Sequence, residues 1–229
     1  MSPFQKFIVN IGWTTLGKAV VQIILFAISI LLTRYLGKER LGDYATLLVI
    51  PVFIRLLTSF GFETLVNKKL PEIRIQDSSG AEGRYLIGRL LIFRFMTTTL
   101  FCILIYYFLL HYLDFINNPG LIEFRWALIF YFFVITVDSL LSTLFMTLLR
   151  FKTLAKTETL GSLLNLVFLI IFIRLDYGIY AVLYAYIISI GITSVIYLIL
   201  ARDQYLGMVK KPELDDMGHL AWVSYGIGF

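Results

Sequence analysis

Long apolar runs separated by short polar segments dominate this chain. A helix needs about 20 apolar residues to cross roughly 30 Å of hydrocarbon, and its backbone groups must be hydrogen-bonded within the segment. The runs do not show the short alternating pattern of membrane β-strands. The pattern predicts an all-α, polytopic membrane bundle with six transmembrane helices, over Gly12–Arg34, Asp43–Val66, Leu86–Tyr112, Ile122–Leu148, Thr157–Leu175 and Gly178–Ala201.

The segments between these runs are expected to be loops. The polar stretch "NKKLPEIRIQDSSGAEGR" after the second span contains Gly and Ser and is predicted to be a linker. The stretch "DFINNPG" predicts a turn between the third and fourth spans. We expect residues 1–201 to form a six-helix unit, 202–217 a polar loop, and 218–229 the start of a seventh span cut short at Phe229.

Composition supports a membrane protein. Hydrophobic residues make up 59% of the chain and charged residues 15%, with a mean hydropathy of +0.84, whereas soluble domains carry about 25% charged residues. The single cysteine, Cys102, excludes an intrachain disulfide. The N-terminal apolar run has one early lysine and no A-x-A cleavage pattern, so we interpret it as a retained span and not as a signal peptide.

The basic residues in the loops predict the orientation. Cytoplasmic loops carry an excess of Lys and Arg. The N-terminal segment and the even-numbered loops hold eleven such residues, and the odd-numbered loops hold four. We therefore expect the N-terminus and the even-numbered loops to be cytoplasmic. The eleven are Lys6, Lys68, Lys69, Arg74, Arg84, Arg150, Lys152, Lys156, Arg202, Lys210 and Lys211, and the four are Arg34, Lys38, Arg40 and Arg174.

Five basic residues lie inside the predicted spans. Arg89 and Arg125 are within about a turn of a span end, where long side chains reach the interface. Lys18, Arg55 and Arg94 lie deeper. A charge at the bilayer centre costs at least about 2.5–3.5 kcal/mol, and such residues usually face a bundle interior or a wet cavity. These three are therefore candidates for contact with a polar ligand.

Polar residues recur at helical spacing on each of the first five spans. On the second span, Pro51 lies one turn before Arg55 and is expected to bend the helix. Several helices with one polar side predict a polar central cavity. The polar faces comprise Thr15, Lys18, Gln22, Ser29 and Thr33; Arg55, Ser59 and Glu63; Arg94, Thr97 and Thr98; Asp138 and Ser142; and Glu158, Ser162 and Asn165.

Three of these residues have alternative interpretations. Asp138 is either the buried ion-pair partner of Arg55 or a coupling group, and Glu63 has the same two alternatives. Arg94 either contacts a ligand or extends toward the cytoplasmic interface. The sequence shows no His or Cys cluster for a metal, no phosphate-binding loop and no nucleophile beside a base. We therefore expect no enzyme activity and no cofactor.

Four segments carry a resemblance to a known family. The stretch from Asn10 to Ile50 resembles the N-terminal signature of polysaccharide flippases, whose first helix ends in an LG-x-x-x-x-G-x-Y loop; here the loop is "LGKERLGDY". "LLTSFGFETLVNKKLPE" is similar to the family's second helix and its "LPE" loop entry. "LLRFKTLAKTETLGSLLNLVFLI" and "YGIYAVLYAYIISIGITSVIYLIL" resemble the fourth-to-fifth connection and the sixth helix. The chain is thus similar to Wzx-type O-antigen flippases of the multidrug/oligosaccharidyl-lipid/polysaccharide exporter superfamily.

This resemblance implies a transporter in the bacterial inner membrane that moves a polyprenyl-pyrophosphate-linked oligosaccharide of O-antigen, lipopolysaccharide or capsule from the cytoplasmic to the outer leaflet. Family members have two six-helix lobes, and the chain resembles the N-terminal lobe, so we expect a partial product or the association of two copies. Cationic residues on the first two helices are common in this branch. Substrate contacts are therefore expected from Lys18, Gln22, Arg55, Ser59 and Arg94.

Two alternatives are left open. A cation-coupled multidrug exporter of the same fold would need membrane carboxylates, whereas basic residues here match or outnumber the deep acids Asp138 and Glu63. A non-transporting membrane partner in glycan assembly is the other alternative. Possible partners therefore include other glycan-assembly membrane proteins besides the lipid-linked substrate, and nucleic acid is not expected.

Overall fold

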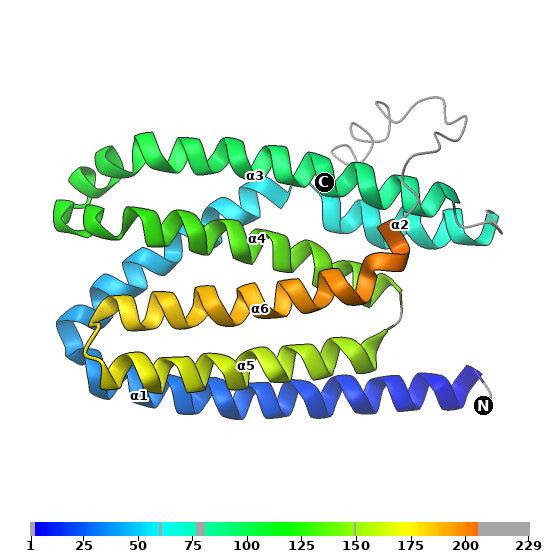
Figure 1. The fold of residues 1–229 in the computed structure, drawn as a ribbon, viewed down its shortest axis with the longest axis horizontal. Helices are drawn as coiled ribbons and strands as arrows, with labels where there is room; N and C mark the ends of the chain where they lie inside the picture. Colours follow the sequence, from blue (N-terminus) through cyan, green and yellow to red (C-terminus); the bar gives the residue numbers. More distant parts are fainter. Residues whose placement is uncertain (1–2, 60, 77–80, 149, 206–229) are drawn as a thin grey trace.

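The fold is an all-helical bundle, as predicted from the apolar runs (Figure 1). The computed structural model describes residues 3–59, 61–76, 81–148 and 150–205, and this part of the chain contains no strand. Its elements are α1 (Pro3–Ser59), α2 (Phe62–Gln76), α3 (Ala81–Phe115), the 3₁₀ helix η1 (Pro119–Phe124), α4 (Arg125–Thr147), α5 (Phe151–Arg174) and α6 (Ile179–Tyr205).

The first two predicted spans form the two arms of one long, kinked helix, α1. The apolar part of α1, Gly12–Leu56, has 45 residues, which corresponds to about 67 Å of helix, more than twice the hydrocarbon thickness. Gly37 interrupts it with non-helical angles, φ 69° and ψ −179°. A residue with a side chain rarely adopts this positive φ, so glycine permits the kink. We call residues 3–36 the first arm and 38–59 the second arm.

In the described ranges, five helices are long and apolar enough to cross a membrane, the α1 stretch among them. Because the Gly37 kink divides α1 into two arms, this corresponds to the six predicted spans. The expected start of a seventh span, 218–229, lies outside the described residues, as does the predicted loop 206–217.

The prediction for the region after the second span was wrong in two respects. The second span was expected to continue to Val66, but α1 ends at Ser59 and Gly61 turns the chain with φ 68°. Much of the predicted linker is helix α2. Val66 and Leu70 lie on one side of α2 and are buried against α3 and α4. Because most other residues of this segment are polar, the sequence pattern did not reveal the apolar spacing of four between Val66 and Leu70.

The helices lie side by side in the order α3, α4, α6, α5 and the first arm of α1 (Figure 1). The most extensive packing joins α5 to α6, α1 to α5, and α4 to α6. The second arm of α1 runs diagonally behind this row, from the kink toward α3. The first arm of α1 therefore lies at the edge of the row, next to α5, and the second arm lies behind the row.

Small residues bring α5 close to both of its neighbours. A Cβ atom built on Gly17 would lie 2.7 Å from Cβ of Ala155, and one built on Gly161 would lie 2.7 Å from Cγ2 of Thr193. Small residues allow close helix approach in membranes, where packing replaces the hydrophobic driving force. This packing holds Thr193 of α6 directly beside α5.

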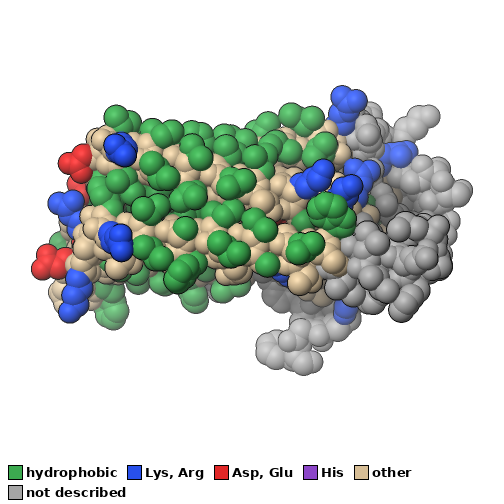
Figure 2. Space-filling model, turned by 90° about the horizontal axis from the view of Figure 1, so that it is seen from below, with side chains coloured by type: hydrophobic (Ala, Val, Ile, Leu, Met, Phe, Trp, Pro, Cys, Tyr) green, Lys and Arg blue, Asp and Glu red, His purple; other side chains and the backbone are tan. Residues whose placement is uncertain are grey.

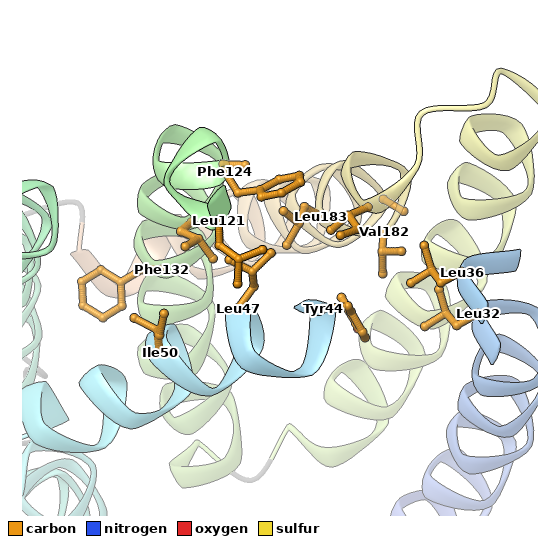
Figure 3. Close-up of a cluster of buried hydrophobic side chains, with 14 of the residues drawn as sticks. Leu32, Leu36, Tyr44, Leu47, Ile50, Leu121, Phe124, Phe132, Val182 and Leu183 are labelled. Atoms are coloured by element: carbon orange, nitrogen blue, oxygen red, sulfur yellow. The ribbon is translucent and has the colours of Figure 1, made fainter. Parts of the chain in front are cut away.

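Two apolar clusters hold the bundle together, one toward each end. The first surrounds the Gly37 kink, where Leu36, Tyr44 and Leu47 pack with Phe124 and Val182 (Figure 3). The second joins α2 and α3 to the later halves of α4 and α6. Between the charged ends, the surface of the face in Figure 2 is mostly hydrophobic, as expected for contact with lipid.

Side-chain contacts fasten the loops at the kink end. The Tyr35 hydroxyl donates to Asp176 Oδ1 at 3.1 Å and accepts a hydrogen bond from the Gly178 backbone N–H at 2.8 Å. Asn118 donates to Asp43 Oδ1 at 2.9 Å. The predicted turn after α3 is confirmed, and these bonds tie it and the α5–α6 turn to α1.

The fold places the two predicted groups of loop cations at opposite ends. Arg34, Lys38, Arg40 and Arg174 lie at the kink end, whereas the described members of the larger group lie at the end that holds α2 and the α4–α5 connection. We propose that the α2 end faces the cytoplasm, because it has the excess of basic residues.

This orientation predicts the labelling of single cysteines at two exposed positions. One replaces Glu72 on α2, and the other replaces Asp114 near the end of α3. In a Cys102→Ala background, a membrane-impermeant thiol reagent should label Glu72→Cys only after cell lysis and Asp114→Cys in intact cells. The reverse pattern would show that the bundle is inserted the other way round.

Candidate functional site

A polar layer crosses the bundle between the two apolar clusters. On α4, Phe132 belongs to the first cluster and Leu140 to the second, and polar residues lie between them. The same order is found on α3, α5 and α6. Buried polar groups at this depth are costly and usually functional. The layer comprises Arg55, Thr58, Arg94, Thr98, Thr136, Asp138, Ser139, Glu158, Asn165, Ser189, Thr193 and Ser194.

A pocket of about 340 Å³ opens within this layer between α1, α4, α5 and α6. Its wall combines two carboxylates with amide and hydroxyl groups. The polar lining includes Asp138, Glu158, Asn165, Tyr186, Thr193 and Tyr197. The predicted polar cavity therefore exists in part, but four helices build it and its charged lining residues, Asp138 and Glu158, are acidic.

Asp138 is held in this pocket by α6. Its Oδ1 accepts hydrogen bonds from Thr193 Oγ1 at 3.2 Å and from Ser194 Oγ at 3.3 Å. Arg55 is close enough to interact electrostatically, but within the described ranges no hydrogen bond or ion pair joins it to Asp138. The geometry therefore gives Asp138 hydroxyl partners and not the direct Arg55 pair that was one of its two interpretations.

The polar face of the first α1 arm is exposed. Lys18 and Gln22 both point away from the bundle core, and Lys18 interacts electrostatically with Glu158 of α5. Ser29 and Thr33 donate to carbonyls of their own helix, each at 2.8 Å, which satisfies their hydroxyls. Of this stripe, Lys18 and Gln22 are the members best placed for a ligand beside the pocket.

Arg55 on the second arm is half-buried near α4. Tyr131 and Asp138 both lie within its electrostatic range. Its Nε is buried and has no hydrogen-bond partner in the described part of the chain. Because a guanidinium does not lose its proton in proteins, this donor favours an anionic acceptor.

Arg94 has a different environment. Its side chain is 3% exposed, and its Nη1 donates to the backbone carbonyl of Thr58. Thr58 belongs to the last turn of α1, whose carbonyls lack partners within the helix. Arg94 therefore caps the end of α1 from α3, and this position differs from the predicted extension toward the interface.

The side chains of Ser59 and Glu63 lie outside the described part of the structure. Gly61 separates the two residues with its positive φ. Ser59, in the last turn of α1, keeps the predicted helical spacing of four from Arg55, whereas Glu63 lies beyond the turn, in α2, and does not continue that helical face. Pro51 stays within regular helix, and the sharp bend is at Gly37.

Tyrosines extend the polar layer toward the kink. The side chains of Tyr44 and Asn165 lie close enough to the Tyr186 hydroxyl of α6 to act on it. The rings of Tyr131 and Tyr186 meet edge to face, with centroids 6.1 Å apart. Tyr131 also lies near Arg55. A chain of polar groups thus connects the pocket on α5 with the second arm of α1.

Comparison with known families identifies the class of protein. The family model described as "Polysaccharide biosynthesis protein" matches residues 7–229. The chain belongs to this family. The match confirms the resemblance to polysaccharide flippases that the four sequence segments indicated. No curated protein and no solved structure matches the chain.

Sequence reasoning missed part of this polysaccharide biosynthesis protein's site. Five spans were recognised as having a polar face, but α6 was not, although it supplies Ser189, Thr193 and Ser194. Ser189 and Thr193 are four residues apart, so the helical spacing was visible. Glu158 was assigned to a polar face but not to the deep carboxylates, because it lies close to the start of its predicted span.

Proposed function

We propose that the protein moves a polyprenyl-pyrophosphate-linked oligosaccharide across the bacterial inner membrane, as a transporter and not as an enzyme. The observation that carries this proposal is Arg55, a permanent cation at mid-membrane depth whose buried Nε–H has no acceptor in the described part of the chain. A pyrophosphate that leaves water needs charge-assisted hydrogen bonds. Arginine matches phosphate oxygens in a fixed fork.

The exposed stripe supplies a second element of the proposal. Lys18 and Gln22 lie on the outward side of the first arm, on a surface with the composition of a lipid-facing one. An ammonium group exposed there favours a water-filled cavity over lipid. We propose that this face lines the substrate path opposite the second lobe that the family resemblance implies. Alternating access then exposes the path to each leaflet in turn.

The carboxylates of the pocket give the alternative of a cationic-drug exporter some support. Asp138 and Glu158 would suit a cationic drug. However, Asp138 already accepts two hydrogen bonds, and Lys18 acts electrostatically on Glu158. Arg55 has a buried Nε–H without an acceptor in the described part of the chain, and a ligand could supply that acceptor. The anionic lipid-linked glycan therefore fits this layer better.

Deletion of the gene tests the proposed function. Cells without it should lose surface glycan and accumulate the lipid-linked oligosaccharide on the cytoplasmic leaflet, since synthesis continues while crossing stops. Leaflet location is measured by protection from an added glycosidase in right-side-out and inverted vesicles, and re-expression should reverse both effects. Normal surface glycan in the deleted strain, or accumulation on the outer leaflet, would contradict the proposal.

A further inference from the structure

Two lysines and a tryptophan meet on the surface where α1 and α5 lie together near their first turns. Gly17 packs against Ala155 and allows the two helices to approach closely. One turn before Gly17, Trp13 of α1 is exposed, and Nζ of Lys152 on α5 lies over its ring, 5.1 Å from the centroid. Lys156 follows one turn later on α5 and is also exposed. The three side chains Trp13, Lys152 and Lys156 therefore form a basic surface that spans two helices.

This basic surface lacks a negative partner within the described part of the chain. Neither lysine forms an ion pair or a hydrogen bond among the described residues. The first arm of α1 contains no Asp or Glu. The nearest acid along α5 is Glu158, which lines the pocket and interacts with Lys18. Because like charges one helical turn apart destabilise each other, Lys152 and Lys156 favour an anionic partner.

Exposed apolar side chains continue from the basic surface toward the middle of the bundle. Residues at steps of three and four share one face of a helix, and here the exposed ones that follow are apolar: Leu160, Leu163 and Val167 on α5, and Leu16 and Val20 on α1. Figure 2 shows basic side chains gathered at the right-hand end, where α1 begins, and a hydrophobic surface beyond them. A partner with an anionic head and an apolar body matches this order.

The depth of the basic surface matches the headgroup level of a membrane. Lys152 is the second residue of α5, and Lys156 lies about 6 Å further along the helix. Lysine side chains are long enough to carry both ammonium groups back to the interface, and tryptophan is enriched there. This end of the bundle is the proposed cytoplasmic end, and the cytoplasmic leaflet carries anionic lipids that basic groups attract.

We infer that Trp13, Lys152 and Lys156 bind the headgroup of one anionic phospholipid, whose acyl chains lie against the exposed apolar faces of α1 and α5. The two ammonium groups contact the phosphate, and the Trp13 ring holds Lys152 in place through a cation–π contact. A zwitterionic phospholipid brings an ammonium group of its own, which the lysines repel. The site therefore selects a lipid with a net negative charge, such as phosphatidylglycerol.

Native mass spectrometry of the detergent-purified protein measures the binding of single lipid molecules. Since each lysine near an anionic headgroup strengthens binding about fivefold, the wild type should bind its first phosphatidylglycerol at least about tenfold more tightly than its first phosphatidylethanolamine. Lys152→Gln and Lys156→Gln should each weaken phosphatidylglycerol binding about fivefold, and the double variant should lose the preference. Lys68→Gln is the matched control, because it removes an exposed lysine from α2 at the same end of the bundle. It should bind phosphatidylglycerol as the wild type does.

Four results would overturn the site. They are equal affinity of the wild type for the two lipids, wild-type affinity in the double variant, an equal loss in Lys68→Gln, and displacement of the lipid by glycerol phosphate or inorganic pyrophosphate. The third would indicate a general attraction of anionic lipid to this end, and the fourth a site for a small phosphate compound. Glycerol phosphate should not displace the lipid, because it lacks the acyl chains.

Thermal unfolding gives a second measurement of the same site. A ligand that binds only the folded protein stabilises it. Phosphatidylglycerol should therefore raise the unfolding temperature of the wild type more than that of the double variant, and equal shifts would overturn the site. Both lysines are exposed, so their replacement should leave the fold intact. Neither measurement requires transport, so the inference and the proposed function are tested separately.

Discussion

Replacing Arg55 by alanine should reduce export of lipid-linked glycan at least about a hundredfold while the protein still reaches the membrane. Hydrogen bonds to charged groups contribute about 1.5–3 kcal/mol each, and a guanidinium fork makes two of them with a phosphate. Arg55 makes no hydrogen bond or ion pair to Asp138 in the described part of the chain. The fold therefore loses little when Arg55 is removed, and the ligand loses its cation.

The measurement is surface glycan in the deletion strain, normalised to the amount of membrane protein. Arg55→Lys should keep only part of the activity, because lysine retains the charge but not the two-pronged geometry. Arg89→Ala is the matched control: it removes an exposed arginine from α3 whose Nε donates a hydrogen bond to the exposed Tyr85 hydroxyl at 3.1 Å, away from the polar layer. Wild-type export by Arg55→Ala would remove Arg55 from the transport mechanism.

The helical fold was predictable because apolar length decides it. In lipid, the backbone of every span must form its hydrogen bonds within the helix. The long apolar runs therefore predicted α3, α4, α5 and α6 with errors only near their ends. The kink at Gly37 and the turn at Gly61 were not predicted, since they depend on single positive φ values. Helix α2 was missed because its polar residues masked the buried spacing of Val66 and Leu70.

The sequence predicted several residues of the candidate site, but it did not predict which groups these residues contact. Depth alone selected Arg55, Arg94 and Asp138 as unusual. Sequence spacing describes one helix at a time, and the roles depend on contacts between helices. Asp138 meets hydroxyls from α6, and Arg94 meets the end of α1. Two arginines of similar depth thus have different neighbours, and their variants should behave differently.

The polar layer also gives a physical reason for combining opposite charges in one site. A charged side chain that leaves water costs less free energy when a group of opposite charge lies near it. The layer places Arg55 and Lys18 on the α1 arms and the carboxylates on α4 and α5. The chain Tyr131–Tyr186–Asn165 connects the two regions.

Replacing Arg94 by alanine should destabilise the protein and leave transport per folded molecule within about twofold of wild type. Arg94 is 3% exposed and donates to the Thr58 carbonyl in the last turn of α1. Its loss leaves that buried carbonyl without its charged donor, which costs about 1.5–3 kcal/mol, and it also leaves a void between α3 and α1. Thermal unfolding in detergent should show the lower stability, and membrane levels should fall with it.

Arg94→Lys separates a capping role from substrate binding. A lysine at this position can still donate to a carbonyl, so it should recover much of the stability, whereas Arg55→Lys should recover little of the transport. Arg89→Ala, five residues earlier on the same helix, should unfold as wild type does because Arg89 is exposed. If Arg94→Ala were as stable as wild type yet failed to export glycan, Arg94 would belong to the substrate site, as the sequence alone predicted.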